Sequence, residues 1–196
     1  MFSQTAMGTD FLLFVECFII YSLIGWVVES VYMSFCERRP VNRGFAKGPF
    51  CPIYGCGGAI GYLLMHSLEN HVIGLYFTGV ILATTFEFLV GMLMKRFLHK
   101  VWWDYNDKPF NYKGIICLES SIAWGFYAVI IVRYLNRFVV GTALMVPRRI
   151  GMAVCAVIVT GYLIDFFYHL LVALDMTPAE CKDKIVENVR EFRERW

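Results

Sequence analysis

The chain has 196 residues, of which 58% are hydrophobic and 17% aromatic, and its mean hydropathy is +0.56. Soluble domains contain roughly half apolar residues, so this composition excludes an ordinary soluble domain. It indicates an integral membrane protein surrounded by membrane lipids. The net charge is only +2, which gives no indication of nucleic-acid binding, and we expect no nucleic-acid partner.

Five stretches are long and apolar enough to be interpreted as membrane spans, because crossing the hydrocarbon core takes about 20 residues. They cover residues 11–35, 52–68, 72–94, 115–132 and 150–174. The second stretch is shorter than the others and rich in glycine. We therefore predict an all-α polytopic membrane protein. Its five-helix transmembrane domain covers residues 1–175, and a cytoplasmic tail covers residues 176–196.

The tail carries the signals of an amphipathic helix. Thr177, Pro178 and Glu180 supply a capping residue, a proline at the first helical position and the glutamate of a capping box. Apolar residues then form one stripe on a charged helix: Ile185, Val189, Phe192 and Trp196. We expect this helix to lie on the inner membrane surface, with docking to a partner as the alternative. A second short interfacial helix is expected over residues 134–145, which are too polar at their start to cross the membrane.

The basic residues indicate how the chain is oriented, because cytoplasmic loops carry an excess of Lys and Arg. If the C-terminus is cytoplasmic, the inner loops and the tail hold the larger set: Arg38, Arg39, Arg43, Lys47, Lys95, Arg96, Lys100, Lys108, Lys113, Lys182, Lys184, Arg190, Arg193 and Arg195. The outer side then holds only Arg133, Arg137, Arg148 and Arg149. We predict a multi-pass protein of the cell membrane with its N-terminus outside and its C-terminus in the cytoplasm.

Four carboxylates are embedded in the predicted spans: Glu29, Glu87, Glu119 and Asp165. An ionisable side chain in hydrocarbon is costly, so it usually faces the bundle interior or a wet cavity. At 1.5 Å per residue, all four lie roughly 9–15 Å from the cytoplasmic boundary. We expect them to line one cytoplasm-facing cavity that binds a cation, protons, or a cationic or polyhydroxylated substrate. The alternative is that Arg43 reaches in and neutralises one glutamate.

Two further residues are expected to share this cavity. Tyr32 falls on the same helical face as Glu29, three residues further on. Ser121 belongs to a row of small residues in the fourth span, with Glu119 to its side. Rows of small residues usually mean close helix packing, so packing alone is the alternative interpretation.

Two cytoplasmic loops are expected to form the mouth of the cavity. The first loop contains Asn42 and Arg43, which suit a phosphate among other ligands, and it leads through several glycines and prolines to Tyr54. The second loop contributes polar and aromatic residues: Trp103, Asp104, Tyr105 and Asn111. Its aromatic rings also suit the membrane interface, which is the structural alternative.

The seven cysteines are scattered along the chain, without a CxxC motif or the His/Cys spacing typical of a metal site. Most of them fall within or at the ends of the spans, where small packing residues are common. We therefore expect no metal and no cofactor. The sequence assigns no catalytic residue.

The loops and three of the four carboxylates also carry a family resemblance. The first motifs are Tyr-Ser-x-Ile-Gly-Trp-x-x-Glu ending at Glu29, Asn-Arg-Gly-Phe from Asn42, and Gly-Pro-x-x-Pro-Ile-Tyr-Gly from Gly48. The later motifs are Glu-Phe-Leu-Val-Gly from Glu87, Trp-Asp-Tyr from Trp103, and Asn-Tyr-Lys-Gly-Ile-Ile-Cys-Leu-Glu-x-Ser-x-x-Trp-Gly from Asn111. Over residues 18–130 the chain resembles the bacterial putative ABC-transporter permease family, called CmpB-like, and shares stretches with small eukaryotic transmembrane proteins. Asn106 departs from the serine that is more usual in the family.

The resemblance implies a permease, and we predict a permease-like protein whose cavity takes an ion or small solute. The chain has no Walker A motif, so it is not the ATPase. Five short-looped spans are few for a complete transporter, which implies a homo-oligomer or a partner membrane subunit. One alternative is a membrane-embedded enzyme acting on a lipid or isoprenoid, with Glu29, Glu87 and Asp104 as acid–base groups and Arg43 and Lys47 holding a phosphate. The other is a non-catalytic scaffold or sensor.

Overall fold

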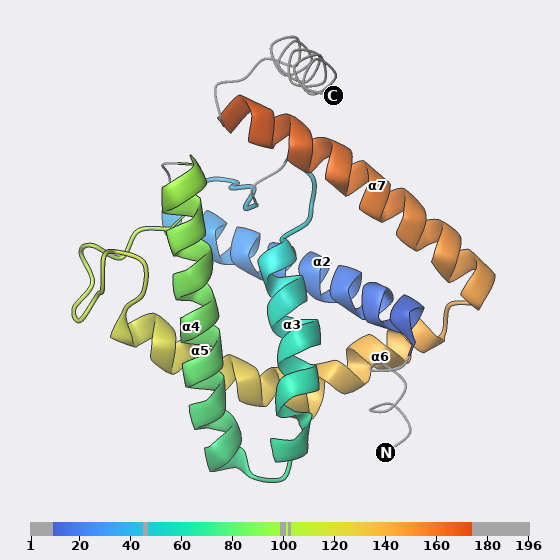
Figure 1. Ribbon diagram of the computed structural model, residues 1–196, viewed down its shortest axis with the longest axis horizontal. Helices are drawn as coiled ribbons and strands as arrows, with labels where there is room; N and C mark the ends of the chain where they lie inside the picture. The colour runs from blue at the N-terminus through green and yellow to red at the C-terminus, as the bar shows by residue number, and fades with distance from the viewer. Residues whose placement is uncertain (1–9, 45–46, 99–100, 102, 174–196) are drawn as a thin grey trace, which may run out of the picture.

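All the regular elements in the described part of the chain are helices. The computed structural model describes residues 10–44, 47–98, 101 and 103–173. In chain order the elements are α2 (Phe11–Glu37), α3 (Pro52–Met65), the 3-10 turn η1 (His66–Leu68), α4 (Val72–Leu98), α5 (Leu118–Ile130), the π-helical turn η2 (Ile131–Leu135), α6 (Asn136–Leu144) and α7 (Arg148–Ala173) (Figure 1). No strand occurs in these residues, which confirms the all-α class. The predicted tail helix lies outside the described residues.

Four helical stretches within the described residues are long and apolar enough to cross a membrane. They are Phe11–Glu37, Val72–Phe97, Leu118–Leu144 and Arg148–Val172. The first, second and fourth of these begin and end within three residues of a span expected from hydropathy, and the third begins near an expected span but ends 12 residues beyond it. The remaining stretch, α3, has 14 helical residues, which is fewer than a typical crossing helix. The chain is therefore a multi-pass membrane protein.

The fourth span continues further than its polarity suggested. The helix predicted over residues 134–145 is present as α6, but it is not separate from the fourth span, because α5, η2 and α6 form one helical stretch of 27 residues. A π-helical turn is a common site of a bend, and the ribbon changes direction between α5 and α6 (Figure 1). α6 thereby packs against α2: Val139 is fully buried, and Asn136 accepts a hydrogen bond from the hydroxyl of Tyr21 at 3.0 Å.

Ion pairs tie the helices together at one end of the bundle. Arg148 at the start of α7 lies 2.6 Å from Asp10, the residue that caps α2. This guanidinium holds the pKa of the Asp10 carboxyl below its usual range. Arg137 of α6 lies 3.1 Å from Glu69, in the turn that precedes α4. These contacts place the starts of α2, α4 and α7 at the same end.

The two long loops meet at the opposite end of the bundle. There α2, α4 and α7 end, and α3 and α5 begin (Figure 1). The first loop, residues 38–51, joins α2 to α3. The second loop, residues 99–117, joins α4 to α5. The candidate site lies at this end.

Glycines allow α2 and α3 to approach closely. A Cβ atom at Gly25 of α2 would clash with the side chain of Tyr54 on α3, and a Cβ atom at Gly58 of α3 would clash with the ring of Tyr21 on α2. In lipid, where helices gain little from the hydrophobic effect, such small residues let van der Waals contacts hold helices together. This contact explains Gly55 and Gly58 of the glycine-rich second stretch, because both face side chains of α2.

We expect Gly58→Ala to lower the stability of the fold by about 1–3 kcal/mol, because the added methyl group overpacks the contact with Tyr21. Thermal unfolding of the purified protein in detergent checks this. Gly57→Ala is the matched control, since nothing lies within 4 Å of a Cβ atom there. It should be neutral or stabilising by up to about 1 kcal/mol, because alanine favours helix over glycine. Equal effects of the two substitutions would contradict the packing argument.

Candidate functional site

A cavity of about 330 Å³ lies among α2, α3, α4, α5, α7 and the two loops. Its lining combines charged residues, aromatic rings and a few apolar or small side chains. The lining residues are Glu29, Arg43, Gly44, Cys51, Pro52, Ile53, Tyr54, Glu87, Val90, Met94, Trp103, Tyr105, Trp124, Tyr162 and Phe166. Five helices and both loops therefore contribute to one site.

Glu87 is the most buried charged residue of the cavity, with 4% of its surface exposed. One carboxylate oxygen accepts a hydrogen bond from the Tyr105 hydroxyl at 3.1 Å. The other accepts from the Trp124 indole nitrogen at 3.0 Å and lies 3.3 Å from the hydroxyl of Ser120. These donors are neutral, and no ion pair to Glu87 occurs among the residues that the structure describes. The carboxylate is thus held in place without being neutralised.

Tyr105 remains a donor over a wide pH range. Burial, with the carboxylate of Glu87 close by, raises the pKa of its phenol above the ordinary value. The hydroxyl therefore remains protonated at physiological pH and donates a hydrogen bond to Glu87. Because Tyr105 lies on the second loop, this loop is part of the site.

Glu29 enters the cavity from α2, on the side of the first loop. The thiol of Cys51, at the start of α3, lies 4.0 Å from a carboxylate oxygen of Glu29. Burial, reinforced by Glu29 and opposed by Arg43, raises the pKa of the Cys51 thiol to about 12. Cys51 therefore stays protonated near neutrality and acts as a weak hydrogen-bond donor.

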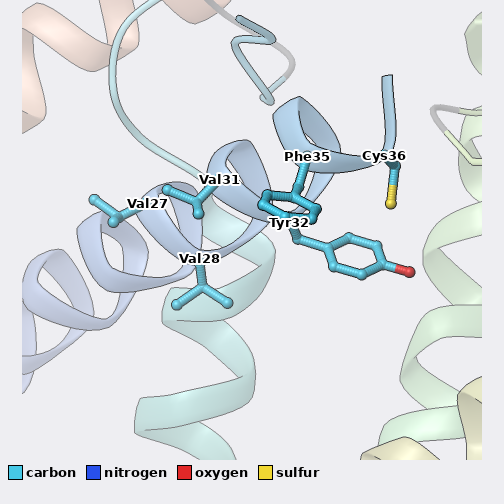
Figure 2. Close-up of a pocket in the computed structure, with 6 residues that line it drawn as sticks. All are labelled: Val27, Val28, Val31, Tyr32, Phe35 and Cys36. Carbon is cyan, nitrogen blue, oxygen red and sulfur yellow. The ribbon is translucent and has the colours of Figure 1, made fainter. Parts of the chain in front are cut away.

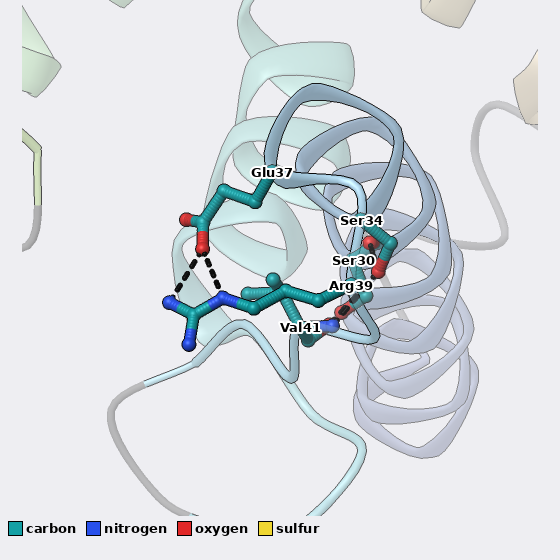
Figure 3. Close-up of polar contacts among 5 residues, drawn as sticks. All are labelled: Ser30, Ser34, Glu37, Arg39 and Val41. Carbon is teal, nitrogen blue, oxygen red and sulfur yellow. Dashed lines mark hydrogen bonds and ion pairs between the residues drawn. The ribbon is translucent and has the colours of Figure 1, made fainter.

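The first loop is bound along the last turns of α2, which brings Arg43 to the cavity. The hydroxyl of Ser34 accepts a hydrogen bond from the backbone N–H of Val41 at 2.9 Å, and that of Ser30 accepts from the N–H of Arg43 at 3.1 Å. Ser34 also donates to the Ser30 carbonyl one turn earlier at 2.6 Å, as Figure 3 shows. Because the two serines are four residues apart, they lie on one face of α2 and hold the returning loop in register.

The far end of the first loop is fixed to α7 and the core. The backbone N–H of Gly48 donates to Asp165 at 2.8 Å, and the imidazole of His169 lies 3.0 Å from the other oxygen of this carboxylate. Phe50 is 5% exposed and packs against Tyr162, with ring centroids 4.6 Å apart. The loop is therefore held between α2 and α7, next to the cavity.

The second loop is shaped by its own side chains. Asp104 accepts hydrogen bonds from the backbone and side-chain nitrogens of Asn106 at 2.9 and 2.6 Å. Asn111 donates to the Asn106 carbonyl at 3.1 Å and accepts from the N–H of Gly114 at 3.2 Å. Gly114 has φ +67°, a conformation that favours glycine. These contacts leave the ring of Trp103 in the cavity wall, with its indole nitrogen bound to the carbonyl of Ile115 at 2.7 Å.

A family model described as "Putative ABC-transporter type IV" matches residues 16–170, which include both loops and every residue of the cavity lining. The chain belongs to this family. No curated protein and no solved structure matches it. The family therefore provides the transport context, and the geometry of the chain itself must identify the site.

The structure places the carboxylates of this family member in three environments. Glu29 and Glu87 line the cavity. Asp165 binds the first loop through Gly48 and does not belong to the cavity lining. Glu119 points away: its side chain is 67% exposed and lies 2.8 Å from Lys108, which raises the pKa of that lysine.

The other predicted site residues are also divided. Arg43, Tyr54, Trp103 and Tyr105 line the cavity, whereas Asp104 and Asn111 stabilise the second loop. Asn42 accepts a hydrogen bond from the Trp26 indole nitrogen, and the Ser121 hydroxyl donates one to the Cys117 carbonyl. Tyr32 is 65% exposed and lies in a separate shallow groove of apolar residues on α2 (Figure 2). α3 begins beside Ser22 and Gly25, so it does not cover α2 as far as Tyr32.

Four further residues of the candidate site were not predicted from the sequence. Ser120 and Trp124 are the donors that α5 directs at Glu87, and Tyr162 and Phe166 form the wall contributed by α7. A signal for each pair was present, because residues four apart share a helix face. In both pairs the prediction selected an adjacent carboxylate instead, Glu119 or Asp165, which lies on a neighbouring face of the helix.

Two hydroxyl oxygens near the site are buried and have no hydrogen-bond partner among the described residues. They belong to Tyr162, which lines the cavity, and to Thr84, one turn before Glu87 on α4. Buried polar atoms are normally paired, so each such atom calls for an explanation. A polar ligand group or a water molecule in the cavity would supply a partner for Tyr162. No group of three or more His, Cys, Asp or Glu side chains in the described residues is placed to hold a metal ion.

Proposed function

We propose that this chain is a permease-like membrane subunit that binds an ion or small solute in the cavity lined by Glu29 and Glu87. The observation that carries the proposal is the environment of Glu87, a buried carboxylate on a membrane-spanning helix with three neutral donors around it. Ionisable residues inside membrane spans commonly mark ion or substrate pathways. Membership of a family described as an ABC transporter supports the transport role.

A cationic ligand fits this environment best. The donors around Glu87 are neutral and no counter-ion to it occurs among the described residues, so its ionised form attracts a cation that enters the cavity. With Glu29, Glu87 and Arg43 all ionised, the cavity has a formal charge of −1. A volume of about 330 Å³ is at the lower end of the range for small-molecule sites, which favours a small solute.

We further propose that α3 and η1 together make a short fifth crossing. Their 14 and 3 residues would extend roughly 27 Å at the rises of α- and 3-10 helices, close to the thickness of the hydrocarbon core, about 30 Å. Only three residues separate η1 from α4, and α4 returns beside α3 (Figure 1). If α4 crosses the membrane, α3 beside it therefore spans most of the same depth.

The proposed orientation places both long loops and the cavity mouth in the cytoplasm. Its support is the excess of Lys and Arg in these loops. We expect an Asp107→Cys variant, altered in the exposed part of the second loop, to react with a membrane-impermeant maleimide in inside-out vesicles and not in intact cells. Labelling of this position in intact cells, located by mass spectrometry, would reverse the orientation.

We propose that further copies or a partner membrane subunit complete the transporter. Only 11% of the apolar window of α7 and 17% of that of α4 are buried within the chain, which leaves broad apolar faces for lipids or other subunits. Native mass spectrometry of the protein extracted from its membrane tests this. A strictly monomeric species that transports on its own after reconstitution would contradict it.

The transport role is tested with proteoliposomes loaded with a mixture of sodium, potassium, methylammonium, choline and putrescine. Efflux of each ion is followed by elemental analysis and mass spectrometry. We expect at least one cation to leave faster than from protein-free vesicles, and Glu87→Gln to lower that rate at least about tenfold, because it removes the charge that binds the cation. Glu119→Gln, which alters an exposed carboxylate outside the cavity, should retain the rate. No efflux above the protein-free rate, or equal efflux from Glu87→Gln, would refute the transport role of this site.

A further inference from the structure

We infer that the cavity selects an organic cation, an ammonium group carried on a compact apolar body, over inorganic ions and neutral solutes. This inference deepens the proposed function and rests on it for the location of the site. Three observations point to this class of ligand: the aromatic walls, the balance of charge, and an unpaired hydroxyl.

Aromatic rings make up much of the cavity wall and come from different elements. They belong to Tyr54, Trp103, Tyr105, Trp124, Tyr162 and Phe166. Ring centroids of Tyr54 and Trp124 lie 6.5 Å apart, and those of Tyr162 and Phe166 lie 5.8 Å apart. Such rings attract ammonium groups through their negative faces, most strongly where water is excluded. They also provide apolar surface for the carbon atoms of the ligand, which an inorganic ion lacks.

The carboxylates supply charge but not a cage of oxygens. Glu87 already accepts from or contacts three donors, and a carboxylate has about four acceptor sites. Calcium takes six to eight oxygen ligands, and magnesium demands a near-octahedral set. The described residues offer no metal-binding cluster, and the cavity is far larger than a bare ion. An ammonium group needs only one or two acceptors, so it suits this geometry.

The hydroxyl of Tyr162 indicates a second feature of the ligand. Tyr162 lines the cavity on the α7 side, and its hydroxyl oxygen is buried and has no hydrogen-bond partner among the described residues. A ligand that carries a hydroxyl or N–H group besides its cationic centre would satisfy this oxygen. Amino alcohols and diamines have both features, so the structure favours them over simple alkylammonium ions.

Equilibrium binding to the purified protein tests the ligand class. Tryptophan fluorescence is the readout, because Trp103 and Trp124 line the cavity. The probes are choline and putrescine as organic cations, potassium and sodium chloride as inorganic salts, and 3,3-dimethylbutan-1-ol, the neutral isostere of choline. We expect saturable binding of at least one organic cation and none of the neutral isostere. The dissociation constant for sodium and potassium should be at least tenfold weaker.

Matched variants separate the contributions of charge and aromatic wall. Glu29→Gln and Glu87→Gln should each weaken binding of the organic cation at least about 30-fold, as expected when one partner of a buried charge pair is removed. Phe166→Leu should weaken it about 2- to 30-fold through loss of a cation–π contact. The control is Phe138→Leu on α6, which is 63% exposed and outside the cavity lining and should change binding less than twofold.

The outcomes also separate this inference from the proposed function. Tighter binding of potassium or sodium, or equal binding of choline and its neutral isostere, overturns the organic-cation class and leaves the transport role in place. Equal effects of Phe166→Leu and Phe138→Leu overturn the role of the aromatic wall. If no probe changes the fluorescence and no cation leaves the proteoliposomes, the proposed function fails and this inference fails with it.

Discussion

Replacing Glu87 with alanine should lower the free energy of unfolding by roughly 2–5 kcal/mol, the largest effect we expect from a single polar substitution in this chain. The indole of Trp124 and the hydroxyl of Tyr105 would lose their common acceptor. A buried donor left unpaired costs about 1–3 kcal/mol, and the deleted side chain leaves additional empty space. Unfolding in mixed micelles with increasing SDS, followed by circular dichroism, measures the change.

Glu87→Gln should retain most of this stability, which makes it the proper variant for functional assays. The amide oxygen of glutamine can take the place of the carboxylate oxygen that contacts Trp124 and Ser120, and it can accept the hydrogen bond from Trp124. Its NH₂ group would then face Tyr105, whose hydroxyl can accept as well as donate. If Glu87→Gln is as unstable as Glu87→Ala, the carboxylate is needed for folding as a charge, and the hydrogen-bond account is wrong. Glu119→Ala should leave stability unchanged, because that side chain is exposed.

The second large effect is expected at Phe50, where alanine should cost about 3–5 kcal/mol. This ring is 5% exposed and packs between Tyr162 of α7 and Phe18 of α2, at centroid distances of 4.6 and 6.0 Å. Its removal leaves a void where the first loop is held against both helices. We expect weaker contact between α7 and α2, seen as a lower midpoint in the same SDS unfolding measurement.

Phe167→Ala is the matched control for Phe50, because it removes the same ring from an exposed position of α7. It should lower stability much less, since no cavity forms where lipid or detergent replaces the side chain. Ligand binding should fall in Phe50→Ala as well, because the adjacent loop positions Arg43 and Cys51 at the cavity. A Phe50→Ala protein with unchanged midpoint would show that the loop does not depend on this contact.

These results would connect the loops to the site physically. The first loop is held by Ser30 and Ser34 on α2 and by Asp165 on α7. The second loop is bound to the site through Tyr105 and Glu87. The cavity is therefore built by loops whose backbone groups are bonded to membrane helices, an arrangement tolerated at membrane depth only where such groups are satisfied within the protein.

The sequence by itself determined the class of the protein and the positions of three of its four long helices, α2, α4 and α7. Continuous apolar runs leave no alternative to helices in a bilayer, because each backbone group must be bonded within the chain. A carboxylate within an apolar run can be recognised from the sequence, so Glu29 and Glu87 were predicted as site residues. The same reasoning also selected Glu119 and Asp165, which do not line the cavity. The loop motifs around Arg43 and Tyr105 pointed to the same end of the bundle.

Only the tertiary structure decided which neighbouring residues face the cavity. Adjacent residues of an α-helix point about 100° apart, so Ser120 faces Glu87 while Glu119 pairs with Lys108 in solvent. Depth along the helix, which sequence indicates well, does not set this rotation. The rotation of each helix is set by the helix that packs alongside it. For α6 it is also set by the π-helical turn η2, which continues the helix past polar residues where the sequence suggested an end. Contacts far apart in the chain, such as the bond between Asp165 and Gly48, depend on this packing, because it alone determines which helix faces meet.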